Sequence, residues 1–148
     1  MRRAQRRGAA TVLVAGTAAG LLAACLPSGG REPERTPVPD EVIFDAVREI
    51  PGVTGHDLVY TDTFGSTGYS GEVVVSDDAD PACVLDRTLA LLWQGRSYLS
   101  VAVKQGDEFT HPADLADGLP RAAAFAERYG DKPDDGVLRE VDPPACAG

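Results

Sequence analysis

Cys83 has the strongest claim to chemistry in this sequence, because it closely follows Asp80-Pro81. Aspartate followed by proline predicts a helix N-terminus, with the aspartate as the cap and the proline as the first helical residue. A thiol in the first helical turn lies near unpaired backbone N–H groups, which lower its pKa. However, the sequence has no CxxC motif, and only Arg87 is a nearby basic residue. A thiol-dependent enzyme using Cys83 is therefore an alternative hypothesis.

The two histidines, His56 and His111, fall in segments that read as loops. A serine at position 70 lies in "GYSGE", where the second glycine comes one position too early for the G-x-S-x-G elbow of a hydrolase. The sequence has no Walker A motif, no dinucleotide-binding glycines, no HExxH and no paired zinc-ligand spacing. We therefore expect a non-catalytic protein with no catalytic residues and no cofactor.

Three acids in the stretch "SDDAD", Asp77, Asp78 and Asp80, are weak candidates for a metal site. Calcium takes six to eight oxygen ligands, and this loop could supply some of them. The loop lacks the glycine and the terminal glutamate of an EF-hand. We interpret the three residues as solvated loop acids, with Asp80 as a helix cap, and keep a divalent-metal or small-ligand carrier as an alternative function.

The first 25 residues have the organisation of an export signal. Four arginines and no acid lie within residues 2–7, and residues 9–24 are small or apolar. This apolar run is shorter than the roughly 20 residues of a membrane-spanning helix. It ends in Leu22-Ala23-Ala24-Cys25, which resembles the lipobox of bacterial lipoproteins. The resemblance implies a signal peptide over residues 1–24, a diacylglycerol thioether on Cys25 and acylation of its amine, palmitate being a typical acyl group.

The lipoprotein resemblance implies a location at the extracytoplasmic face of the cell membrane. Two or more acyl chains hold a protein stably at a bilayer, whereas one chain does not. Exported proteins fold in an oxidising compartment, so the remaining two cysteines, Cys83 and Cys146, are expected to form a disulfide. Closing the loop between them would stabilise the fold by about 4 kcal/mol in the chain-entropy model.

The charge of the mature chain limits its partners. Without residues 1–24, ten basic residues face 23 acidic ones, giving a net charge of −13. Such a chain is repelled by nucleic acid. We therefore expect no nucleic-acid partner, and an envelope protein as the partner.

The sequence predicts one folded domain behind a tether. Residues 25–39 are rich in proline and glycine and have no apolar period, which is typical of a linker. Residues 40–148 form the predicted domain, with a proline-rich C-terminal tail. The expected elements are a helix within 39–52, strands at 57–65 and 69–76 around a loop at 65–68, a helix at 81–94, a strand at 97–105, a helix within 119–130 and a weak strand at 137–141.

This order, α-β-β-α-β-α with an optional last strand, predicts an α+β fold. The helix between the second and third strands favours a right-handed crossover, which makes those two strands parallel. A small mixed sheet of three to four strands with helices on one face follows. A ferredoxin-like variant, in which the C-terminal strand takes the place of a missing first strand, is one candidate topology. The expected function is that of a membrane-anchored lipoprotein with a binding or adaptor domain.

Overall fold

A computed structural model of the chain describes residues 35–96, 98–116, 118–119 and 121–146. It confirms the α+β prediction: a mixed sheet with helices packed on it. The helices are α1 (Asp40–Arg48), α2 (Pro81–Gln94), α3 (Pro112–Leu115), α4 (Ala122–Tyr129) and the 3-10 helix η1 (Pro144–Cys146). The strands are β1 (Val53–His56), β2 (Val59–Thr63), β3 (Ser66–Val75), β4 (Leu99–Gln105) and β5 (Glu108–Thr110).

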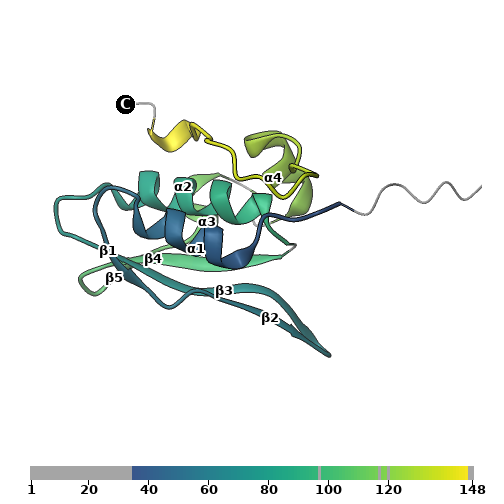
Figure 1. The fold of residues 1–148 in the computed structure, drawn as a ribbon. Coiled ribbons are helices and arrows are strands. Elements are labelled where there is room, and N and C mark those ends of the chain that lie inside the picture. Colours follow the sequence, from purple (N-terminus) through teal and green to yellow (C-terminus); the bar gives the residue numbers. More distant parts are fainter. Residues whose placement is uncertain (1–34, 97, 117, 120, 147–148) are drawn as a thin grey trace, which may run out of the picture. The chain divides into compact units, whose positions relative to one another are not determined.

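Strand β3 is the central strand of the sheet. It pairs with β4 in parallel from Tyr69↔Leu99 to Val75↔Gln105, as the α2 crossover predicts. Its other edge pairs antiparallel with β2 along one half and β1 along the other. β5 folds back on β4 through Gly106-Asp107. The sheet thus has five strands rather than three to four, and Figure 1 shows the helices gathered on one of its faces.

The core lies between this helical layer and the sheet. α2 places an apolar stripe on the sheet because its leucines recur at helical spacing. On strand β4, successive side chains point to opposite faces of the sheet, and every second one is directed at the helices. The large apolar and aromatic side chains of α1, α2, β3, β4 and α4 that are fully buried are Ile43, Val47, Tyr69, Val73, Leu85, Leu89, Leu92, Val103 and Phe125.

The strand boundaries differ from the sequence prediction at the first hairpin. The expected four-residue loop at 65–68 is only Phe64-Gly65, because Thr63 pairs with Ser66 and the strand continues from there. Residues 53–56 form an additional strand, β1, which the sequence prediction missed. Gly55 and the preceding turn Pro51-Gly52 gave no strand signal, and only pairing with β3 makes residues 53–56 extended.

The two ends of the domain also differ from the prediction. Residues 137–141 form no strand, and the fourth position across the sheet is filled by β5, so the ferredoxin-like variant is wrong for the described residues. Described residues before the predicted boundary at residue 40 also pack on the domain. Val38 is only 1% exposed, the Thr36 N–H donates to the Asp134 carbonyl at 3.0 Å, and the Arg35 side chain donates to the Gln94 carbonyl at 2.7 Å.

Candidate functional site

The face of the sheet turned away from the helices is the candidate site, and we call it the open face. Side chains alternate along each strand, so paired residues of neighbouring strands point to the same side. One set of positions is directed at the core, and the other set is directed away from it. The open face consists of Val59, Ser70, Glu72, Val74, Ser100, Ala102, Lys104 and Phe109.

Apolar side chains remain exposed on this face. Val59, Val74 and Phe109 have 50%, 39% and 44% of their surface exposed. Val73, next to Val74 but directed at the helices, is completely buried. These three side chains share one face but are separated by polar positions such as Ser70 and Lys104, so a binding surface here combines apolar and polar groups.

A shallow hollow of about 490 Å³ crosses the open face. It extends from Asp57 over Gly71 and Glu72 to β4, and ends at the segment 109–112. The middle of the hollow is lined by small residues, namely Gly71, Ser100 and Ala102. Such a floor lets an approaching chain come close to the sheet.

Polar groups stand at both ends of the hollow. At one end, Asp57 is locked onto the sheet: its Oδ1 accepts from the Glu72 N–H at 2.5 Å, and its own N–H donates to the Glu72 carbonyl at 3.1 Å. At the other end, the His111 ring stacks on Phe109 with 6.2 Å between centroids, and Lys104 Nζ lies 5.4 Å from the Phe109 ring centre. His111 thus belongs to the hollow, although its sequence context gave no functional signal.

The helical side of the same sheet holds a second polar cluster. Tyr69 Oη donates to Asp40 Oδ1 at 2.6 Å, and Arg96 lies 3.3 Å from the other oxygen of that carboxylate. The Arg96 guanidinium also covers the Tyr60 ring at 4.1 Å. Burial, and then the bond to Asp40, raise the pKa of Tyr69 well above its usual value. Asp40 therefore connects α1 to the sheet, and it does not cap the helix as its position suggests.

Cys83 and Cys146 are joined by a disulfide, with 2.03 Å between the two Sγ atoms. The bond fixes η1 to the first turn of α2. Arg87 Nε donates to Cys146 Sγ at 3.3 Å, so this basic residue also contacts the bonded pair. A bonded Cys83 carries no thiolate, which favours the structural role over the thiol-enzyme hypothesis.

Next to the disulfide, α2 buries a charged residue that the sequence prediction overlooked. Asp86 is completely buried and accepts from Arg128 Nε and Nη2 at 2.7 and 2.6 Å, from Tyr129 Oη at 2.6 Å and from the Ala145 N–H at 2.8 Å. Burial alone raises the pKa of Asp86, but the bonds from Arg128, Tyr129 and Ala145 outweigh it, and the net pKa lies below its usual value. The network fastens α4 and η1 to α2.

The remaining polar residues singled out from the sequence have structural surroundings. Asp80 caps α2 as predicted, since its Oδ1 accepts from the N–H groups of Ala82 and Cys83 at 3.0 and 3.3 Å. Within the described ranges, no three His, Cys, Asp or Glu side chains are placed to share a metal ion, and Asp77 and Asp78 lie exposed in the turn before α2. His56 lies under α1, where its Nδ1 accepts from the Leu58 N–H at 3.3 Å.

Lys132 is the basic residue with the most unusual environment. Its Nζ donates to the Arg96 carbonyl at 2.6 Å and lies 4.0 Å from the centre of the Trp93 ring. Burial and the nearby Arg35 lower the pKa of Lys132 to about 8. The ammonium group is already used to hold the tail over the end of α2, so we assign it a structural role.

The N-terminal assignments lie outside the described residues. This applies to the signal peptide over 1–24, to the lipidated Cys25 and to residues 26–34 of the tether. Among the residues that are described, no helix combines the length and the apolar character needed to cross a bilayer. No protein-family model, no curated protein and no solved structure matches this chain.

Proposed function

We propose that this chain is a lipoprotein, anchored through Cys25 at the extracytoplasmic face of the cell membrane, whose domain binds an envelope protein through the open face. The observation that carries the proposal is the contrast between the two faces of one sheet. The helices bury one face, whereas Val59, Val74 and Phe109 stay exposed on the other, where Phe109 also lines the hollow. Apolar side chains that stay exposed in the folded domain can still lose contact with water when a partner covers them, and this burial favours binding.

The chemistry of the open face suits a protein partner. Its apolar positions are separated by Ser70, Ser100, Glu72 and Lys104, which can hydrogen-bond to a partner's polar groups. Non-obligate protein interfaces contain apolar and polar side chains in similar proportions to the rest of the surface. The mature chain is strongly acidic, and this favours a partner surface that is basic.

Site-specific photo-cross-linking in intact cells tests this interface. A photo-reactive amino acid at Val74 samples the open face, and the same residue at Val42 on α1 is a matched control, because these valines are 39% and 42% exposed. We expect one dominant protein adduct, identified by mass spectrometry, from position 74 and not from position 42. The same adduct from both positions, or none from position 74, would contradict the proposal.

A second variant tests the anchor. Replacing the cysteine by alanine, Cys25→Ala, removes the sulfur that carries the lipid in the family it resembles. We expect the protein to leave the membrane fraction or to keep its signal peptide, seen as a change in mass. Normal processing with unchanged membrane retention would refute the lipidation of Cys25 and leave the cross-linking result intact.

A small-ligand carrier remains the second candidate function, favoured by the volume of the hollow. About 490 Å³ lies within the range of small-molecule sites, and Asp57 and His111 place polar groups at its two ends. If position 74 yields no protein adduct, thermal stabilisation by a metabolite library, lost in His111→Ala, would support this alternative.

A further inference from the structure

The outer edge of β2 is a strand edge without the usual protection. Strand edges are normally shortened, bulged or given lysine or proline, because their free N–H and C=O groups can pair with another chain. The other outer strands follow this rule: β5 has three residues, and β1 has an irregular register against β3. β2 pairs regularly over all five residues, from Val59↔Ser70 to Thr63↔Ser66, and contains neither lysine nor proline.

The alternation of the β2–β3 ladder identifies which groups of β2 are free. In a hairpin with the two-residue loop Phe64-Gly65, the closing pair Thr63↔Ser66 exchanges backbone hydrogen bonds. Because hydrogen-bonded pairs alternate along an antiparallel ladder, the N–H and C=O groups of Thr61 and Val59 also point toward β3. The N–H and C=O groups of Tyr60 and Asp62 therefore point away from the sheet. No described strand pairs with that side of β2.

Two copies of β2 can pair antiparallel in one register that uses all of these groups. With Thr61 opposite Thr61 of a second copy, Tyr60 lies opposite Asp62 of that copy, and both residues offer free N–H and C=O groups. Thr61 itself forms the central, non-hydrogen-bonded pair. Val59 lies opposite Thr63 of the second copy, so side chains of the open face again meet each other.

Charge complementarity selects this register. The side chains of Tyr60 and Asp62 are directed to the helical side of the sheet, opposite Tyr69 and Thr67. Arg96 lies on the Tyr60 ring at 4.1 Å, and its side chain is 44% exposed. In the Thr61-centred register, Asp62 of each copy faces the Tyr60 and Arg96 pair of the other. In a register centred on Asp62, the two carboxylates would instead repel each other.

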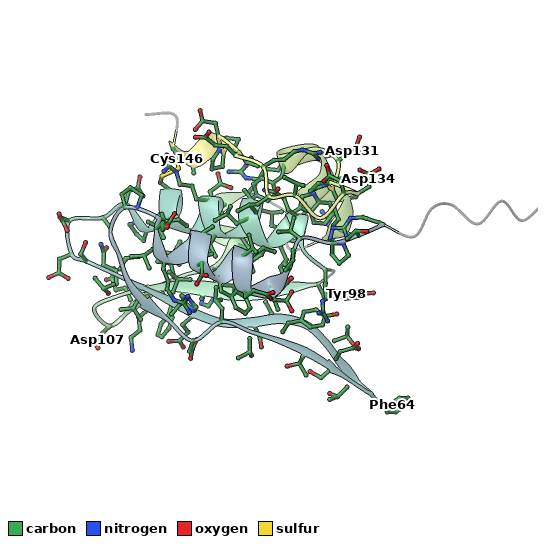
Figure 2. All side chains as sticks on the ribbon, viewed as in Figure 1. Phe64, Tyr98, Asp107, Asp131, Asp134 and Cys146 are labelled. Carbon is green, nitrogen blue, oxygen red and sulfur yellow. A yellow bond between two sulfur atoms is a disulfide. The ribbon has the colours of Figure 1, made fainter. Side chains whose placement is uncertain are left out.

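We propose that two copies of this chain associate through antiparallel pairing of their β2 edges, centred on Thr61. The product is a continuous sheet, with both open faces on one side and both helical layers on the other. The register also brings the fully exposed Phe64 at each hairpin tip, visible in Figure 2, alongside Leu58 of the other copy. This interface is separate from the open face, so it stands whether or not that face binds a partner.

Disulfide trapping in the full-length, membrane-bound protein tests the register. Non-hydrogen-bonded pairs have Cα atoms about 4.5 Å apart, which suits a disulfide. We expect Thr61→Cys to give mostly covalent dimer on mild oxidation in membranes, seen on non-reducing gels. Thr63→Cys is the matched control, because it lies on the same strand and face but opposite Val59 of the second copy, and it should stay at least fivefold less cross-linked.

Two further variants connect the dimer to the proposed contacts. Asp62→Lys in the Thr61→Cys background should lower the cross-linked fraction severalfold, because it places a lysine against Arg96. Asp107→Lys makes the same charge change at an exposed acid in the turn between β4 and β5, on the other side of the domain from Phe64 in Figure 2, and should leave the fraction unchanged. Circular dichroism of the four variants confirms that they fold.

The same gels can overturn the proposal. Equal dimer from Thr61→Cys and Thr63→Cys would indicate random collision. No dimer from Thr61→Cys in a folded protein would exclude the register. Capture of a different protein in its place would show that the β2 edge serves a heterologous strand and not a second copy.

Discussion

The two faces of the sheet are built in opposite ways. Val73 and Val74 are neighbours on β3, yet the first is fully buried and the second is 39% exposed. The helical side is closed by a disulfide spanning 63 residues and by a buried carboxylate with donors from α4 and the tail. The open face has short polar side chains and a hollow. The fold thus concentrates its stabilising contacts on one face and leaves the other available for binding.

The tail explains why the helical side needs these links. Residues 130–143 contain no helix or strand and so lack regular backbone pairing. The buried side-chain amide of Gln94 takes the place of a backbone partner for Arg139. It donates to the Arg139 carbonyl at 2.8 Å and accepts from the Arg139 N–H at 2.7 Å. Specific side chains thus hold this segment.

The largest expected effect comes from breaking the disulfide. Cys83→Ala with Cys146→Ala frees a 63-residue loop in the unfolded chain, and we expect the free energy of unfolding to fall by about 4 kcal/mol. Urea unfolding followed by circular dichroism measures this loss. A loss below about 1 kcal/mol would mean that the tail is held by Asp86 and Gln94 without help from the disulfide.

Removing the buried carboxylate should cost slightly less. Asp86→Ala leaves Arg128, Tyr129 and the Ala145 N–H without their acceptor, and we expect a loss of about 3 kcal/mol. The matched control is Asp45→Ala, which breaks the exposed ion pair between Asp45 and Arg48 and should cost less than about 0.5 kcal/mol. Equal losses of unfolding free energy in the two variants would show that the buried ion pair contributes no more to stability than the exposed one.

Adjacent valines on β3 compare the two faces directly. Val73→Ala opens a cavity under the helices and should cost about 2 kcal/mol, whereas Val74→Ala should cost less than about 0.5 kcal/mol. Thermal unfolding of both variants measures the difference. A comparable loss at Val74 would indicate that the open face is covered in the folded protein.

The smallest expected effect is a pH dependence of stability that comes from His56, which lies on the helical side of the sheet. Burial first, and Arg48 second, lower the pKa of His56 below its unfolded value, although Asp57 and Asp45 oppose the shift and Phe44 covers the ring. The unfolded chain therefore binds a proton first, and stability falls as the pH drops from about 6.5 toward the folded pKa. His56→Gln should reduce the change in the thermal unfolding midpoint between pH 7 and pH 5. A variant that keeps the wild-type pH dependence would contradict this assignment to His56.

Much of the fold could be predicted from local patterns. The apolar stripe of α2, its Asp80 cap and the crossover to β4 are short-range features, so their prediction was correct. The short strand β5 and α3 were missed because three or four residues carry too little periodicity. The strand expected at 137–141 is absent: "VLREV" has strand propensity, but β5 pairs with the outer edge of β4 instead.

The candidate site was less predictable. Its residues come from four segments, and each looks ordinary alone: Asp57 in a turn, residues 71–72 and 99–102 in strands, and His111 before a proline. The same holds for Asp86, which reads as an exposed residue on an amphipathic helix until Arg128, Tyr129 and Ala145 surround it. No spacing rule in the sequence connects positions more than forty residues apart.

The sequence by itself determined the secondary structure of the central elements, the parallel crossover, the net acidic charge of the chain and the expectation of a Cys83–Cys146 bond. These follow from composition and from periods of two to four residues, which act within a single element. The tertiary structure alone decided which sheet face stays uncovered, which carboxylate is buried and which strand edge is free. Those properties depend on contacts between distant segments, and their free energy exists only once the chain has folded.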